Sequence, residues 1–253
     1  MEGYKLKLAE ILKALLPQPV YERLLRARMR RTADRMFPQI STRLDRVGYI
    51  AYKYGLEQAS YYAKQGEWDN QMLLEGRSLS IPTPESLFPW HGPALAEMEL
   101  LPKGKSARVL DICCGIPTFL EALNLSGFTE LFGTEDNSFM PNVVEAAREY
   151  VSISNINAKI YDVRTGYAGD YRNILKTEKP FDVITNFGVA TYIYFPLIYD
   201  LLAERGLFIA ETYFENVPAE FSSKFELVRS YPEYGFRLRK FAGSGAVSVF
   251  RKK

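Results

Sequence analysis

Apolar residues in the first third of the chain recur at the three- and four-residue steps of amphipathic helices. The pattern predicts a helix over residues 4–16, a second from about Val20 to Met36 and a third from Ser41 to about Gln65. Residues 66–93 hold four prolines among glycine, serine and polar residues, which is typical of an irregular connection. We therefore expect a helical N-terminal extension over residues 1–93.

Beyond residue 94 the pattern changes to short β-branched or apolar runs that alternate with helical stretches. Strands are predicted at 107–112, 130–134, 158–161, 181–185 and 206–210, and helices near 118–125, 140–153, 168–176 and 192–204. Two last apolar runs, 225–229 and 246–250, have no helical pattern between them and predict an antiparallel hairpin. The fold class expected for residues 94–253 is therefore α/β. We expect a doubly wound, mostly parallel seven-stranded sheet with helices on both faces and a C-terminal antiparallel hairpin.

Composition limits the class of protein and of site. With 47% hydrophobic and 25% charged residues, no apolar run long enough for a membrane span and no secretory signal pattern, the sequence predicts a globular cytoplasmic protein. Cys113 and Cys114 are adjacent, so they cannot build a disulfide framework or a structural zinc site. The single histidine, His91, excludes a His-rich cluster. We predict no metal.

The positive charge is concentrated at the N-terminus. The chain carries a net charge of +2, but residues 1–47 hold eleven Lys or Arg against five acids, which gives +6 there and −4 over the remainder. The basic stretch from Tyr21 to Arg35 has three interpretations: it grips nucleic-acid phosphate, it makes peripheral contact with an anionic membrane, or it is simply solvated. It lacks the interleaved aromatics of a single-strand stacking platform, so nucleic acid ranks second as a partner.

The loop after the first predicted strand, residues 111–117, carries the expected ligand site, because open parallel sheets bind ligands beyond the carboxyl ends of their strands. A dinucleotide loop would contain the glycines of G-x-G-x-x-G, and this loop contains only Gly115. That disfavours a nicotinamide-dependent oxidoreductase. The stretch from Val109 to Gly115, VLDICCG, instead resembles the first motif of the class I S-adenosylmethionine-dependent methyltransferases.

The resemblance extends over residues 94–253 and implies S-adenosylmethionine as cofactor and S-adenosylhomocysteine as its product. Glu135 lies 24 positions after Asp111 and ends the second predicted strand, where a carboxylate can accept from both ribose hydroxyls. Asp136 would face adenine. At the end of the third strand, Asp162 would accept from the adenine amino group and Val163 would offer its backbone N–H.

Asn186 and Phe187 end the fourth predicted strand, and the resemblance places them beside the methyl group. Two residues depart from the family pattern: Cys113 and Pro117 stand where glycine is usual, and a loop that needs positive φ would be strained there. Proline suits the first helical position, so we expect Pro117 to begin the next helix. The residues expected to bind the cofactor are Asp111, Cys113, Gly115, Glu135, Asp136, Asp162, Val163, Asn186 and Phe187.

A sulfonium methyl group is already activated, so an enzyme has chiefly to align the acceptor and, where necessary, remove a proton. The candidate catalytic residues are His91, Glu211 at the end of the fifth strand, and Tyr192 after the fourth. Each also has a structural interpretation: a packed or capping side chain for His91, an arginine partner for Glu211, and core packing for Tyr192 and the nearby Tyr194.

The sequence thus predicts an S-adenosylmethionine-dependent methyltransferase that acts on an oxygen, with nitrogen second, of a small-molecule or glycan-type acceptor. The helical extension would form a lid or part of the acceptor pocket. Two alternatives remain open: an RNA or other nucleic-acid methyltransferase that uses the basic helix, and a non-catalytic binding module with the same fold.

Overall fold

The computed structural model describes residues 15–56, 91–138, 141–164, 168–187, 195–211, 218–231 and 247–253, without the side chains of 44, 91–93, 168, 169 and 211. The chain divides into two compact units, Met1–Trp68 and Asp69–Lys253. The expected boundary at residue 94 therefore falls inside the second unit. Across the described parts of the chain, none of the helices is both long enough and apolar enough to span a membrane.

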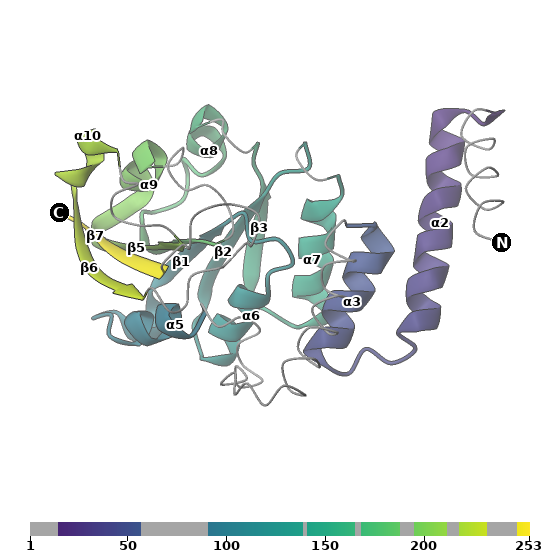
Figure 1. The fold of residues 1–253 in the computed structure, drawn as a ribbon, viewed down its shortest axis with the longest axis horizontal. Helices are drawn as coiled ribbons and strands as arrows, with labels where there is room; N and C mark the ends of the chain where they lie inside the picture. Colours follow the sequence, from purple (N-terminus) through teal and green to yellow (C-terminus); the bar gives the residue numbers. More distant parts are fainter. Residues whose placement is uncertain are drawn as a thin grey trace. The chain divides into compact units, whose positions relative to one another are not determined.

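In the described part of the first unit, two helices pack together, α2 (Gln18–Met36) and α3 (Arg43–Tyr54) (Figure 1). A capping box between Thr42 and Asp45 begins α3. Gly55, with φ 63°, ends it in the left-handed conformation that favours glycine. The helix therefore stops well before the predicted end near residue 65. Most of the helix predicted over residues 4–16 lies outside the described residues.

The second unit is built on one seven-stranded sheet in the order β3-β2-β1-β4-β5-β7-β6 (Figure 1). Its strands are β1 (Arg108–Ile112), β2 (Glu130–Glu135), β3 (Ala158–Asp162), β4 (Phe181–Asn186), β5 (Leu202–Glu211), β6 (Phe225–Tyr231) and β7 (Val247–Lys252). The pairs among β1 to β5 are parallel, and β7 lies antiparallel between β5 and β6. This confirms the predicted fold class, including the C-terminal antiparallel hairpin.

Helices cover both faces of the sheet, with α5 and α6 on one face and α8 and α9 on the other (Figure 1). The helices of this unit are α5 (His91–Glu99), the 3-10 helix η1 (Gly104–Ser106), α6 (Thr118–Leu125), α7 (Val143–Ile153), α8 (Ala168–Ile174), α9 (Phe195–Leu201) and α10 (Ala219–Ser222). Successive strand residues point to opposite faces, so Leu110 and Ile112 of β1 join the buried cluster under α8 and α9. The same alternation sends Asp111 to the other face.

Helix α5 corrects the prediction of an irregular connection up to residue 93, because the helix already begins at His91. Pro93 is its third residue. The first N–H groups of a helix have no intrahelical partner, so proline is tolerated there and did not mark a loop.

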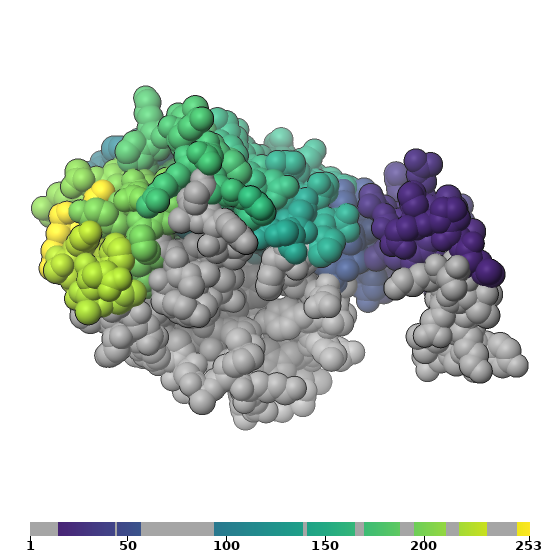
Figure 2. Space-filling view, turned by 90° about the horizontal axis from the view of Figure 1, so that it is seen from above, coloured from purple at the N-terminus to yellow at the C-terminus, as the bar shows by residue number. Residues whose placement is uncertain are grey.

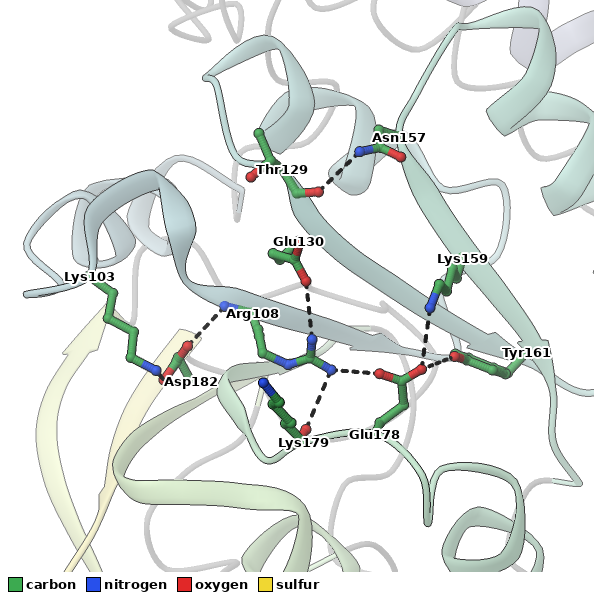
Figure 3. Close-up of polar contacts among 10 residues, drawn as sticks. All are labelled: Lys103, Arg108, Thr129, Glu130, Asn157, Lys159, Tyr161, Glu178, Lys179 and Asp182. Carbon is green, nitrogen blue, oxygen red and sulfur yellow. Dashed lines mark hydrogen bonds and ion pairs between the residues drawn. The ribbon is translucent and has the colours of Figure 1, made fainter.

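Ion pairs hold the strand starts together at the amino edge of the sheet (Figure 3). Arg108 of β1 pairs with Glu130 of β2 at 3.1 Å and with Glu178 at 2.7 Å. The hydroxyl of Tyr161 also donates to Glu178, at 2.5 Å. Burial and the neighbouring Glu178 raise the pKa of Tyr161 to about 12, so this phenol stays protonated. These contacts pair the charges of Arg108 and Glu178 within the protein.

Candidate functional site

The structure gathers acidic and amide side chains at the carboxyl ends of four adjacent strands. Glu135, at the end of β2, lies opposite Asp162 of β3 in the parallel register. Asp111 of β1 lies opposite Thr185 of β4, one residue before Asn186. The sequence placed these residues at successive strand ends. The strand order makes them neighbours.

The loop between β1 and α6 is tied to β2 by its backbone. Cys113 donates its N–H to the hydroxyl of Thr134 at 3.4 Å, and Cys114 donates to the carbonyl of Thr134 at 3.1 Å. The N–H of Gly115 donates to Oε1 of Glu135. Both Cys113 and Gly115 have φ 57°. The expected difficulty at Cys113 is therefore present in the structure, since a residue with a Cβ holds a left-handed conformation there.

Pro117 was expected to begin the helix, but it is the capping residue before the helix. Helix α6 starts at Thr118, because the ψ of 61° at Pro117 is not helical. Its φ of −78° suits the pyrrolidine ring, and its carbonyl accepts from the N–H of Glu121 at 3.1 Å. No positive φ is needed at this position, so the absence of the family's glycine costs little here.

The buried carboxylate of Glu135 joins the loop to the end of β2. One oxygen accepts from Gly115 N–H and the other from Asp136 N–H, the latter at 3.2 Å. Burial raises the pKa of Glu135 against the opposing effect of these two N–H donors. An ionised carboxylate has about four lone-pair sites, so each oxygen retains capacity for a further donor.

Two of the residues expected to contact adenine are already engaged within the protein. The N–H of Val163 donates to the carbonyl of Glu135 at 2.8 Å, and its side chain is buried. The expectation that Val163 offers this N–H to adenine is corrected, because the extended pairing of β2 with β3 takes the donor first. Asp136 is also buried, and it accepts from the N–H and the hydroxyl of Ser138 at 2.7 and 2.5 Å. Asp162, by contrast, is exposed.

Asp111 is the acid whose ionisation the fold changes most clearly. It is buried and accepts a hydrogen bond from the Thr185 hydroxyl at 2.7 Å. Burial raises its pKa from 3.8 to about 7, the Thr185 hydroxyl opposes the rise, and the charge of Glu135 adds to it. The site therefore holds a carboxyl group that is partly protonated near neutral pH.

The two residues expected beside the methyl group, Asn186 and Phe187, lie at the carboxyl end of β4. Asn186 is fully buried and donates its amide N–H to the carbonyl of Ile112 at 3.0 Å, which ties β4 to β1. Within the described residues its amide oxygen has no hydrogen-bond partner. Phe187 is half-buried and meets Phe119 of α6 edge-on, with ring centroids 5.5 Å apart.

The three candidate catalytic side chains lie outside the described residues. His91 begins α5 and Glu211 ends β5, but only their backbones are described, and Tyr192 and Tyr194 fall in a part that is not described. Their catalytic roles stay predictions. Among the described residues, no group of three or more His, Cys, Asp or Glu side chains could hold a metal ion.

Sequence reasoning missed the two threonines of the site, Thr134 and Thr185. Each directly precedes a predicted site residue on a predicted strand, and both are fully buried. A hydroxyl next to an acid or amide at a strand end was the available signal, because a buried polar side chain there needs a nearby partner.

We expect Cys113→Gly to be more stable than Cys113→Ala by about 1 kcal/mol, because only glycine adopts a φ of 57° without strain. Both variants lose the thiol, which packs against the core cluster, so their difference isolates the backbone conformation. Urea unfolding of the two variants measures it.

The adjacent Cys114 provides the matched control. It is not among the described residues with positive φ, so Cys114→Gly should be less stable than Cys114→Ala. If the glycine variant were less stable than the alanine variant at position 113 as well as at 114, the left-handed conformation of Cys113 would carry no cost.

Comparisons with known proteins give structural matches only. No protein-family model matches the chain, and no curated protein matches it. TrmN from Thermus thermophilus aligns at 14% identity and TM-score 0.47, over 64% of this chain and 48% of that one. TehB from Haemophilus influenzae aligns at 15% and 0.47, over 64% and 62%. Ribosomal protein L11 methylase from Lactobacillus delbrueckii aligns at 16% and 0.46, over 65% and 77%.

The alignment spans about half the length of the first of these structures. The fold assignment stands on the sheet itself. The sheet has seven strands, is mostly parallel and ends in an antiparallel hairpin, as the sequence predicted, and its strand order is β3-β2-β1-β4-β5-β7-β6. The chain has the mostly parallel seven-stranded α/β fold that the sequence predicted.

Proposed function

We propose that this chain is an S-adenosylmethionine-dependent methyltransferase that methylates an oxygen of a small-molecule or glycan-type acceptor. The observation that carries the proposal is the carboxylate of Glu135, which lies at the carboxyl end of β2 and accepts from the N–H of Gly115 in the loop after β1. We assign the cofactor to this edge of the sheet.

The residues present fit the ribose of the cofactor. Each oxygen of Glu135 accepts one backbone N–H and retains capacity for one more donor. A ribose with two neighbouring hydroxyls supplies two such donors. The exposed carboxylate of Asp162, opposite Glu135 in the register, suits an adenine amino group.

The charge of the site favours a cationic ligand over a pyrophosphate. Glu135 and Asp136 are buried close to the loop, and Asp111 beside them is partly ionised near neutral pH. The single N–H that Gly115 would offer to a phosphate is already donated to Glu135. A sulfonium cofactor is attracted by these acids, whereas a dinucleotide would bring two negative phosphates toward them.

When bound, the cofactor supplies an electrophilic methyl group. The chain's own contribution is to bind and orient it: Glu135 holds the ribose, and Asn186 and Phe187 line the end nearest the methyl group. His91, Glu211 and Tyr192 are the proposed sources of a general base for a hydroxyl acceptor.

Calorimetric titration with S-adenosylhomocysteine tests the cofactor directly. We expect saturable binding well below millimolar ligand and no comparable binding of NAD. The absence of S-adenosylhomocysteine binding at millimolar concentration would refute the proposal, and tight NAD binding would replace it with an oxidoreductase.

Transfer of a labelled methyl group to a panel of small hydroxylated molecules, glycans and RNA then separates the acceptors. Label on the hydroxylated molecules or glycans supports the proposal. Label on RNA alone would establish the nucleic-acid alternative, and binding with no transfer to any acceptor would favour a non-catalytic module.

A further inference from the structure

Helix α2 is strongly basic from Arg23 to Arg35. It contains six arginines and two acids, Glu22 and Asp34, so its net charge is +4. All six guanidinium side chains are exposed: Arg23, Arg26, Arg28, Arg30, Arg31 and Arg35. Such a helix attracts a surface of negative charge.

Exposed apolar side chains are concentrated in the same segment. Of the eleven large hydrophobic residues that are exposed in the described parts of the chain, six lie between residues 15 and 40. They are Leu15, Val20, Leu24, Leu25, Met36 and Ile40. Leu24, near the middle of α2, keeps 54% of its surface exposed. Four of the six belong to α2, and two of these, Val20 and Leu24, lie four residues apart on one side of the helix. Exposed apolar side chains that share one side of a basic helix mark an interaction surface.

The α3 side of α2 is identified by its contacts. Ala33 is fully buried, Met29 packs where a Cβ on Gly55 would stand, and the ring of Phe37 packs against Gly48. These residues recur at four-residue steps along α2, so they share one side of the helix.

The opposite side of α2 carries Val20, Leu24 and Ala27, four and three residues apart, followed by Arg31. We call these four residues the outer face. By helical geometry, arginines flank it on both sides: Arg23 and Arg30, with the acid Asp34, on one, and Arg28 and Arg35 on the other. Figure 2 draws α2 in purple, with its side chains at the surface of the view. An apolar stripe between two rows of arginine is typical of a helix that lies in a membrane interface.

An open hollow on this side adds a second observation. Its volume is about 550 Å³, and it is bordered by Leu24, Ala27, Arg28, Arg31, Thr32 and Arg35. Three guanidinium groups and a hydroxyl therefore border one space together with apolar side chains. The combination suits a phosphate headgroup attached to acyl chains, because the donors can reach the phosphate while Leu24 contacts the lipid.

We propose that α2 docks this protein on the surface of an anionic phospholipid bilayer, with the outer face in the interface and the flanking arginines at the phosphates. RNA offers negative charge but no apolar phase for Val20 and Leu24, and α2 has no aromatic residue on the outer face for base stacking. An anionic lipid surface can bind both the apolar residues of the outer face and the arginines beside them. The proposal is independent of methyl transfer.

Co-sedimentation of the full chain with vesicles tests it. The vesicles are made of phosphatidylcholine alone or of an equal mixture of phosphatidylcholine and phosphatidylglycerol. We expect binding to the mixed vesicles that high salt weakens, and little binding to phosphatidylcholine alone. Equal binding to both vesicles, or binding to neither, would overturn the proposal.

Two variants on the outer face and its flank separate charge from apolar contact. Arg28→Gln/Arg31→Gln/Arg35→Gln should lower binding to the mixed vesicles on the order of 100-fold, because each basic residue near an anionic surface contributes roughly fivefold. Leu24→Gln should lower it roughly tenfold through lost apolar burial. Both variants leave the α3 side of α2 unchanged, and circular dichroism checks that the helices remain.

The matched control, Lys176→Gln/Lys179→Gln/Lys253→Gln, removes three exposed positive charges from the second unit and should bind as the wild type does. An equal loss in this control would show that net charge alone governs binding and would overturn the docking face. Retention of a single-stranded RNA that depends on the three arginines but not on Leu24, without vesicle binding, would assign α2 to nucleic acid instead.

Discussion

Glu135→Gln is expected to lower the affinity for S-adenosylhomocysteine on the order of 100-fold, because hydrogen bonds to a charged group contribute about 1.5–3 kcal/mol each. The amide keeps one oxygen for the N–H of Gly115 but replaces the other acceptor with a donor. It therefore cannot accept from two ribose hydroxyls. Calorimetric titration of the folded variant measures the loss.

The structure changes how this test has to be designed. Replacement of Glu135 by alanine would remove the acceptor of both Gly115 N–H and Asp136 N–H, so lost binding could follow from a disordered loop. Glutamine keeps the contact to Gly115. Glu130→Gln, at the other end of β2 and paired with Arg108, is the matched control and should bind as the wild type does. Wild-type affinity in a folded Glu135→Gln would remove the ribose role from Glu135.

The second large effect concerns Asp111. The wild type should become less stable as the pH rises and Asp111 ionises, and Asp111→Asn should not show this loss. In the folded protein the pKa of Asp111 is raised from 3.8 to about 7 by burial. The neutral acid is thus favoured by folding. Its stabilising contribution is complete below about pH 4 and is lost as the pH rises through about 7, which corresponds to on the order of 4 kcal/mol.

Asparagine keeps an oxygen to accept from the Thr185 hydroxyl but carries no ionisable proton. We therefore expect the free energy of unfolding of Asp111→Asn, relative to that of the wild type, to increase between pH 4 and pH 8. Urea unfolding of both proteins across this range gives the difference. Burial also raises the pKa of Glu135, but this residue is present in both proteins, so its contribution largely cancels in the comparison.

Thr185→Val is the control for the hydrogen bond. It removes the donor that stabilises ionised Asp111, so it should steepen the pH dependence. If the difference between the free energies of unfolding of the wild type and Asp111→Asn stayed constant from pH 4 to 8, Asp111 would be ionised at little cost in the folded state.

Local patterns were enough to predict most elements of the sheet unit. The helix over 118–125 has the predicted bounds, and β1, β2, β3 and β4 each differ from the prediction by one residue at one end. The reason is that alternation in a strand and three- or four-residue spacing in a helix are recorded in neighbouring residues. Two errors came at breakers, because Gly55 ended α3 early and Pro93 lies inside α5. A third is at β5, which begins at Leu202, inside the helix predicted near 192–204.

The sequence by itself determined the α/β alternation, the loop after β1 and the succession of Asp111, Glu135, Asp162 and Asn186 at strand ends. Only the tertiary structure decided what each of these groups contacts. The carboxylate of Glu135 meets Gly115 from 20 residues away, and Asp111 meets Thr185 from 74 residues away. Strand order and burial set these contacts and the raised pKa of Asp111, and both depend on how distant segments pack rather than on any local pattern.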